Sequence, residues 1–216
     1  MSDYLYIIMC GGNYHMDEPK HLKLIDGEPI LERTVRLLRE NGIQEIAITA
    51  TDARFNKIIE RLQLGQIVHH NTYGDGGRWL EGFVKTPSPT CYIFGDVVFS
   101  PEAIKTIVET ETDTIEFFAS APPFDQRYFK NWAEPFAFKV KDYMTFTKAV
   151  RTTMTLADQG AFYRDPISWE LWQVIKKTPL KQIDYTNYVA INDYTCDVDC
   201  DEDLERLKHI IHLERH

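Results

Sequence analysis

The sequence predicts an α/β protein, a three-layer α/β/α sandwich around a mostly parallel central sheet. Two observations lead to this prediction. Apolar runs of strand length alternate with amphipathic segments of helical length through the first seventy residues, and the joints between them are short. The runs at 5–9 and 91–94 also lack the polar alternation of a strand with one face in water. Strands buried on both faces are typical of parallel sheets covered by helices.

The first half of the chain supplies the alternating units. Pro29 suits the first turn of a helix and Asn41-Gly42 is a typical helix end, so a helix is expected between them. Asp26-Gly27 indicates a turn just before it. In chain order, the expected elements are a strand over 5–9, a helix over 28–41, a strand over 43–49, a helix over 53–62, a strand over 67–69, a helix over 79–85 and a strand over 91–94.

The second half adds helices and further strands. Ser100-Pro101-Glu102 combines an N-cap residue, a proline at the first helical position and an acid, and this predicts a helix start. Trp169 and Trp172 are three residues apart and share one side of a helix, either as a core stripe or as an aromatic wall for a sugar or a cation. The expected elements are a helix over 100–111, strands over 114–121 and 136–140, helices over 141–158 and 161–174, one or two strands over 181–191, and a final helix from 201.

Composition argues against several classes of protein. The chain has 216 residues, a formal net charge of -9 and a pI near 5.3, and this acidity disfavours duplex nucleic acid, which needs a basic face. No apolar run approaches the roughly 20 residues of a membrane helix. The first residues lack the features of a signal peptide, so we expect a cytoplasmic protein with four reduced cysteines. We expect one domain over residues 1–216, and a monomer and a homodimer are both compatible with the sequence.

Two glycine-rich loops follow predicted strands. Gly11-Gly12 comes directly after the first apolar run, and Lys20 stands near the end of the same loop. Adjacent glycines let the backbone approach a ligand and leave amide groups pointing outward, and loops at this edge of an α/β sheet bind phosphates. A second loop over 71–78 leads into a predicted helix. A bound polyphosphate explains the first loop, and a simple tight turn explains its glycine pair equally well.

Three aspartates are expected at the same edge of the sheet. Asp96 comes at the carboxyl end of a predicted buried strand, where an acid can hold a metal over the sheet or cap a turn. Asp197 and Asp199 alternate along an extended segment and therefore point the same way. A zinc site in the same segment is disfavoured because the spacing of its four potential ligands fits no common finger: Cys196, Cys200, His209 and His212.

Several motifs occur together in this chain, and they are Ile7 to Gly12, Pro19-Lys20, Leu24 to Leu31, Leu38 to Thr49, Gly95-Asp96, Asp197-Val198-Asp199 and Glu202-Asp203-Leu204. This set resembles the sugar-phosphate and alcohol-phosphate nucleotidyltransferase family, whose Rossmann-like fold is the nucleotide-diphospho-sugar transferase type. The resemblance covers the first third of the chain well and the last twenty residues moderately. The part over about 122–181 matches only loosely, and the resemblance implies that this variable part binds the acceptor.

The resemblance implies an enzyme that joins a nucleoside triphosphate (CTP, UTP or GTP) to a sugar phosphate or alcohol phosphate and releases pyrophosphate. Such an enzyme would serve sugar nucleotide and polysaccharide biosynthesis and would use Mg²⁺ or Mn²⁺. Lys20 and Asp96 would be catalytic, and the metal ligands would be Asp96, Asp197 and Asp199. The nucleotide would contact Cys10, Gly11, Gly12, Asn13, Lys20, Asn71, Gly76, Gly77 and Arg78. The acceptor would contact Arg127, Lys130, Glu134, Trp169 and Trp172.

The first loop departs from the family pattern. Family members usually carry an arginine between the glycines and the Pro-Lys pair, whereas this chain reads Asn13-Tyr14-His15-Met16. Arginine clamps phosphate with two parallel bonds that histidine cannot make, so His15 or Arg78 takes over this role, or activity is impaired. Two other functions stay open: a GT-A-type glycosyltransferase with Asp197-Val198-Asp199 as its metal motif, and a nucleotide-binding protein without turnover.

Overall fold

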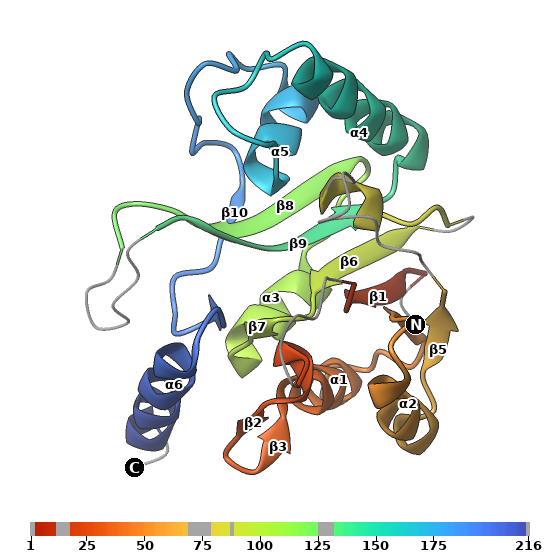
Figure 1. The fold of residues 1–216 in the computed structure, drawn as a ribbon, viewed down its shortest axis with the longest axis vertical. Helices are drawn as coiled ribbons and strands as arrows, with labels where there is room; N and C mark the ends of the chain where they lie inside the picture. Colours follow the sequence, from red (N-terminus) through yellow and green to blue (C-terminus); the bar gives the residue numbers. More distant parts are fainter. Residues whose placement is uncertain (1–2, 12–17, 69–78, 87–88, 125–131, 215–216) are drawn as a thin grey trace.

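A seven-stranded sheet forms the centre of the computed structural model, which describes residues 3–11, 18–68, 79–86, 89–124 and 132–214 (Figure 1). The strand order is β10-β8-β9-β6-β1-β4-β5. The strands are β1 (Leu5–Met9), β4 (Ile46–Thr49), β5 (Gly65–Ile67), β6 (Thr90–Phe94), β8 (Ile115–Ser120), β9 (Glu134–Val140) and β10 (Val189–Ala190). Among the described strands of this sheet, β9 alone runs antiparallel to its neighbours, so the prediction of a mostly parallel sheet is confirmed.

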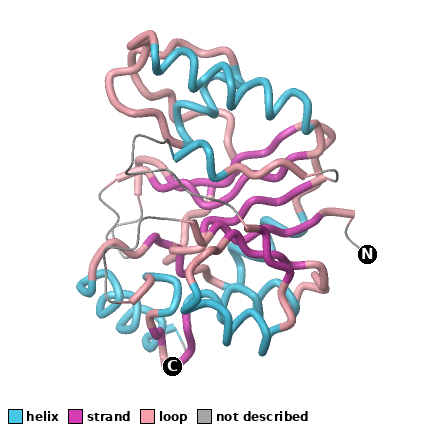
Figure 2. Tube along the Cα trace, turned by 45° about the vertical axis from the view of Figure 1, so that its right-hand side comes forward, coloured by secondary structure: helices cyan, strands magenta, loops and turns pink. Residues whose placement is uncertain are grey.

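Helices cover both faces of this sheet, which gives the predicted three layers (Figures 1 and 2). One layer holds α1 (Ile30–Glu40), α2 (Asn56–Leu62) and α3 (Pro101–Glu109), and the other holds α4 (Tyr143–Asp158) and α5 (Ser168–Lys176). The last helix, α6 (Asp201–Glu214), lies beside a small antiparallel sheet of β7 (Val97–Val98) and β11 (Cys196–Asp197). Single turns of 3-10 helix complete the elements: η1 (Lys20–Leu22), η2 (Ala53–Phe55) and η3 (Trp79–Gly82).

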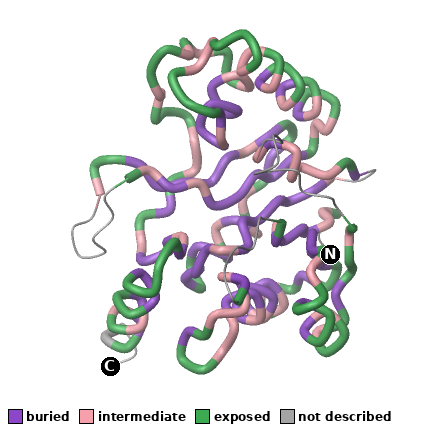
Figure 3. The backbone as a smooth tube through the Cα atoms, in the orientation of Figure 1, coloured by how far each residue is buried: buried purple, intermediate pink, exposed green. Residues whose placement is uncertain are grey.

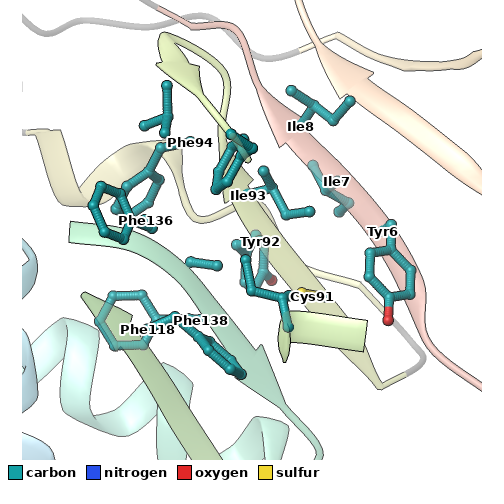
Figure 4. Close-up of a cluster of buried hydrophobic side chains, with 14 of the residues drawn as sticks. Tyr6, Ile7, Ile8, Cys91, Tyr92, Ile93, Phe94, Phe118, Phe136 and Phe138 are labelled. Carbon is teal, nitrogen blue, oxygen red and sulfur yellow. The ribbon is translucent and has the colours of Figure 1, made fainter. Parts of the chain in front are cut away.

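Burial follows the apolar runs of the sequence. All five residues of β6 are buried, as are the central three of β1, and buried backbone concentrates in the sheet while the outer faces of the helices are exposed (Figure 3). Aromatic side chains of β6, β8 and β9 gather in the core beside aliphatic side chains of β1 and β6 (Figure 4). Phe138 of β9, for example, stacks on Phe117 of β8 at 4.5 Å between centroids, and Phe146 of α4 packs against Phe138 at 5.6 Å. The main core is therefore continuous across the sheet.

Several expected boundaries differ from the structure, most clearly at three of the expected helices. The helix predicted from residue 28 begins at Ile30, because Asp26 and Gly27 adopt positive φ and close a hairpin between β2 (Leu24–Ile25) and β3 (Glu28–Pro29). The helix predicted over 79–85 is only the 3-10 turn η3. The helix predicted over 161–174 begins at Ser168 as α5, since Pro166 disfavours helical backbone in the residue before it. Among the described residues, no helix combines the length and the apolar character needed to cross a membrane.

Candidate functional site

Lys20, Asp96 and Asp199 meet at the carboxyl edge of the sheet, although they come from the beginning, the middle and the end of the sequence. The Lys20 ammonium donates to Asp199 Oδ1 at 2.7 Å and to Asp96 Oδ2 at 3.4 Å. Its side chain is 26% exposed, and those of Asp96 and Asp199 are 36% and 56% exposed. The three charges therefore line one surface that water and a small ligand can reach.

Close backbone packing brings Lys20 and Asp96 to this place. Lys20 opens the short turn η1 directly after Pro19, and Asp96 stands in the turn between β6 and β7. Gly95, before it, donates its N–H to the carbonyl of Met9 at the end of β1 (3.1 Å). A Cβ at Gly95 would lie 2.7 Å from both that carbonyl oxygen and the His21 ring. Only glycine permits β1, η1 and the Asp96 turn to approach this closely.

The segment that carries Asp197 and Asp199 is anchored by its own apolar cluster. β11 pairs with β7, and the Val198 N–H donates to the Asp96 carbonyl at 3.0 Å, so Asp96 and the acidic segment share a backbone contact. Beneath them α6 buries Leu204, Leu207 and Ile211 in a second cluster, separate from the main core. Burial of large aliphatic side chains stabilises by roughly 1.5–3 kcal/mol each. This second cluster therefore fixes the last part of the site.

Asp203 orders the backbone of the same segment. Its carboxylate oxygen Oδ2 accepts the N–H groups of Asp199 (2.9 Å) and Cys200 (3.0 Å), and the residue is 8% exposed. An acid three residues into a helix that reaches back to the first N–H groups follows the logic of a capping box. Asp203 therefore restrains the backbone at Asp199, next to the carboxylate that Lys20 contacts.

Asp197 occupies a different environment from Asp199. Its carboxyl group lies against Glu134 of β9 and Cys196, with potential ligand atoms of all three residues within 4.8 Å of one another. Cys196 Sγ donates to Glu134 Oε1 at 3.1 Å. Burial, above all, raises the pKa of Asp197 to about 9, and a hydrogen bond with Glu134 and the negative charge of its neighbours add to this. Asp197 Oδ1 is buried and has no hydrogen-bond partner among the described residues.

The electrostatics of Lys20 balance two opposing effects. Partial burial alone would lower the pKa of Lys20, whereas the negative charges of Asp96, Asp199 and Asp197 raise it, and the net shift is upward. Lys20 therefore stays a cation at neutral pH. The candidate site thus combines a fixed positive charge with three carboxyl groups, whose hard oxygen atoms are the ligands that Mg²⁺ and Mn²⁺ prefer.

Several other predicted site residues are described, and two of the assignments need correction. Cys10 is completely buried and its N–H donates to Thr49 Oγ1 at 3.1 Å, so neither its thiol nor its amide faces a ligand. Trp169 and Trp172 are each 1% exposed and pack in the main core, for example edge-on and tilted against Phe117. These two indoles are therefore part of the core, and they do not form an open aromatic wall for a sugar or a cation. Gly11 is exposed beside the site.

The remaining predicted residues lie outside the described part of the chain: Gly12, Asn13, His15, Asn71, Gly76, Gly77, Arg78, Arg127 and Lys130. Conversely, two residues lie at the site that the sequence alone did not assign to it, Asp203 and His21. Asp203 stood out in the sequence only as part of the motif Glu202-Asp203-Leu204, and its place three residues into α6 was the signal for its capping role. The buried ring of His21 packs against Phe55 beneath the site. Its position directly after Lys20 was the one feature of the sequence that associated it with the site. Glu134 was predicted to contact the acceptor. Its carboxylate is buried beside the carboxyl group of Asp197.

The three-layer fold built around this sheet is one that solved nucleotidyltransferases share. One solved structure with this fold is the CTP:phosphocholine cytidylyltransferase LicC from Streptococcus pneumoniae, which matches with a TM-score of 0.55 and 15% identity over 97% of this chain and 100% of its own. HddC from Yersinia pseudotuberculosis, solved in complex with GMP-PN, matches with a TM-score of 0.49 and 14% identity over 95% of this chain and 98% of its own. No protein-family model and no curated protein sequence matches the chain.

Proposed function

We propose that this protein is a nucleotidyltransferase that joins a nucleoside triphosphate to a sugar phosphate or alcohol phosphate and releases pyrophosphate. The observation that carries the proposal is the contact of one ammonium, that of Lys20, with the carboxylates of Asp96 and Asp199. The fold shared with the phosphocholine cytidylyltransferase supports it. CTP, UTP and GTP are the nucleotides we put forward, and phosphocholine belongs among the acceptors to be tested.

In the proposed reaction an oxygen of the acceptor phosphate attacks the α-phosphorus of the triphosphate. The new P–O bond forms as the bond to the β-phosphate oxygen breaks, and the electron pair leaves with pyrophosphate. Because a phosphate monoester is already an anion near pH 7, the attack needs no strong general base from the protein. Catalysis then depends on alignment of the two substrates and on neutralisation of charge.

Lys20 supplies the fixed positive charge in this proposal. Its ammonium would offset the negative charge that grows on the α-phosphate in the transition state. In the absence of substrate, Asp96 and Asp199 balance this charge. Gly11 is exposed just after β1, and its backbone amide is the group we propose for a phosphate oxygen.

Asp96 and Asp199 would hold a divalent cation, Mg²⁺ or Mn²⁺. Both carboxylates already flank one positive charge, and their hard oxygen atoms fit a hard cation. A bound cation would supply neutralisation of the triphosphate and orientation of the leaving pyrophosphate. Asp197 lies against Glu134 and Cys196. We propose that it mainly holds the chain segment that carries Asp199 in place, and that direct contact with the cation is its lesser role.

The proposal is tested by measuring pyrophosphate release for CTP, UTP, GTP, ATP and dTTP against a panel of sugar and alcohol phosphates that includes phosphocholine. We expect turnover with at least one pair, its loss in EDTA, and its abolition in Asp96→Asn with an unchanged circular dichroism spectrum. An unchanged rate in Asp96→Asn would remove Asp96 from the site. Hydrolysis of a nucleotide sugar without triphosphate turnover would favour a glycosyltransferase, and tight triphosphate binding without turnover a binding protein.

A further inference from the structure

A cavity is lined by residues of α4 and by Lys85. α4 lies on the side of the sheet away from α1 and α3 (Figure 1). The volume of the cavity is about 520 Å³, within the range of roughly 300–1,000 Å³ that small-molecule sites occupy. The cavity lies toward the opposite edge of the sheet from Lys20. Lys85 comes before the amino end of β6. α4 begins just after Val140, which pairs with Thr90 at that same end of β6. Asp96, in contrast, follows the carboxyl end of β6.

The charge of this cavity differs from that of the whole chain. Lys85, Lys148 and Arg151 line it, and no carboxylate of the described residues does, although acids outnumber basic residues 33 to 24 in the sequence. None of these three cations forms an ion pair with a described carboxylate. By contrast, Arg36, Arg61 and other surface cations do form such pairs. Three cations gathered without counter-ions repel one another, and an anionic ligand relieves this repulsion.

The uncharged lining fits the same kind of ligand. α4 contributes a row of threonines to the lining, Thr147, Thr152 and Thr155. The Thr155 hydroxyl donates to the Arg151 carbonyl within the helix at 3.1 Å, so Thr147 and Thr152 are the threonines that can donate to a ligand. Threonine is a weaker helix former than the alanine, lysine or glutamate usual on an exposed helical face, so helix stability does not explain the row. Hydroxyls and charged nitrogens together provide the donors that a phosphate group accepts.

A narrower cavity of about 190 Å³ continues from the first, with Lys85, Tyr143 and Arg151 in both linings. It leads inward to the apolar side chains of Phe83 and Phe146, and Glu81 borders it. An anionic group can therefore contact the cations at the open end while an apolar or aromatic part enters the narrow end. Glu81 disfavours a second anionic group at the narrow end.

We propose that the α4 cavity is a binding site for a small organic phosphate, with the phosphate held by Lys85, Lys148 and Arg151 and the carbon skeleton directed toward Phe83 and Phe146. The site is separate from the nucleotidyl-transfer site and does not depend on the function proposed above. Its test therefore uses binding and not turnover.

Pyridoxal 5′-phosphate is a suitable probe, because it combines a phosphate with an aromatic ring and an aldehyde that reacts with a neighbouring lysine amine. Borohydride reduction fixes the adduct, and peptide mass spectrometry reports each lysine separately, so labelling of Lys20 does not obscure the result. We expect Lys85 or Lys148 to react saturably and about tenfold faster than the exposed lysines Lys57 and Lys181, and phenyl phosphate to protect it.

Arg151→Gln keeps both reactive lysines and removes one phosphate contact, so it should reduce this selective labelling to the level of Lys57. Arg206→Gln is the matched control on α6, since Arg206 is a half-exposed arginine outside the cavity, and it should leave the labelling unchanged. Labelling of Lys85 and Lys148 at the rate of Lys57, a linear dependence on probe concentration, or an absence of protection by phenyl phosphate would each overturn the proposal. A circular dichroism melt of each variant ensures that the compared proteins are folded.

Discussion

Replacement of Lys20 by alanine should separate catalysis from stability. The ammonium bonds Asp199 at 2.7 Å and Asp96 at 3.4 Å, but all three side chains are between 26% and 56% exposed. Ion pairs this open to water contribute at most about 1 kcal/mol each. With 216 residues and an unfolding entropy of about 2.1 cal/mol/K per residue, 1 kcal/mol corresponds to about 2 °C. We therefore expect the Tm of Lys20→Ala to fall by no more than about 4 °C.

The effect on the proposed reaction should be much larger. Loss of one preorganised charge typically lowers kcat by about 10²–10³, which is about 2.7–4 kcal/mol of transition-state stabilisation. The assay is the initial rate of pyrophosphate release with the substrate pair found in the screen, measured beside the thermal melt on the same preparation. The two magnitudes distinguish a catalytic ammonium from a structural one.

Lys23→Ala is the matched control for this experiment. Lys23 lies three residues further along the chain and pairs with Asp201 of the same acidic segment, so it shares the fold context of Lys20 without its contacts to Asp96 and Asp199. Its rate should stay within about twofold of the unmodified protein, because an exposed pair contributes little. A Lys20→Ala protein that retains more than about a tenth of the rate, or that loses about 10 °C of Tm, would refute the reasoning.

Three further predictions concern the second cluster, the acidic segment and the cysteines. Leu207→Ala should lower the free energy of unfolding by about 2–5 kcal/mol in urea denaturation, because Leu207 is 1% exposed in the cluster under α6; a loss under about 1 kcal/mol would show that the helix is loosely packed. Asp203→Ala should raise the Mn²⁺ concentration for half-maximal binding by about tenfold, as measured by electron paramagnetic resonance. Glu202→Ala makes an equal charge change on the same turn and should not raise it. Equal shifts in both variants would show that Asp203 acts through its charge alone. In native protein at pH 8, Ellman's reagent should modify Cys200 rapidly and the other three thiols slowly, because they are buried and because burial raises the pKa of Cys91 to about 12; fast reaction in a Cys200→Ser variant would contradict this.

The sequence was most informative where one local rule determined the structure. The buried strands and α1 followed from apolar periodicity, and the start of α3 followed from Ser100 and Pro101, whose side chain and ring suit the first turn. Boundaries were less predictable where the backbone competed with periodicity. The positive φ of Asp26 and Gly27 makes a hairpin that shortens α1. The position of β9 as an antiparallel strand between β6 and β8 is a long-range choice that no local pattern contains.

The candidate site was predictable as a set of residues but not as a set of contacts. Lys20, Asp96 and Asp199 were expected at one edge because each follows or precedes an element that ends there. Their shared ion pairs depend on the docking of α6, which the second cluster determines and which is not evident from the spacing of the acids. The same limit applies to Trp169 and Trp172. Helical spacing placed them on one face, and only tertiary packing shows that this face points into the core.

The anchoring of the last helix also has a consequence for how the protein is made. Lys20 and Asp199 are 179 positions apart in sequence, so the ammonium has no Asp199 partner until nearly the whole chain has been synthesised. Before that, β7 lacks its neighbour β11, and the side chains of Ile25, Ile30 and Val98 lie uncovered. An incomplete chain thus presents an apolar surface and an unpaired strand edge together, which is the combination that chaperones recognise and that promotes aggregation. Emergence of the segment from Tyr194 to Ile211 covers that surface and completes the candidate site in the same step.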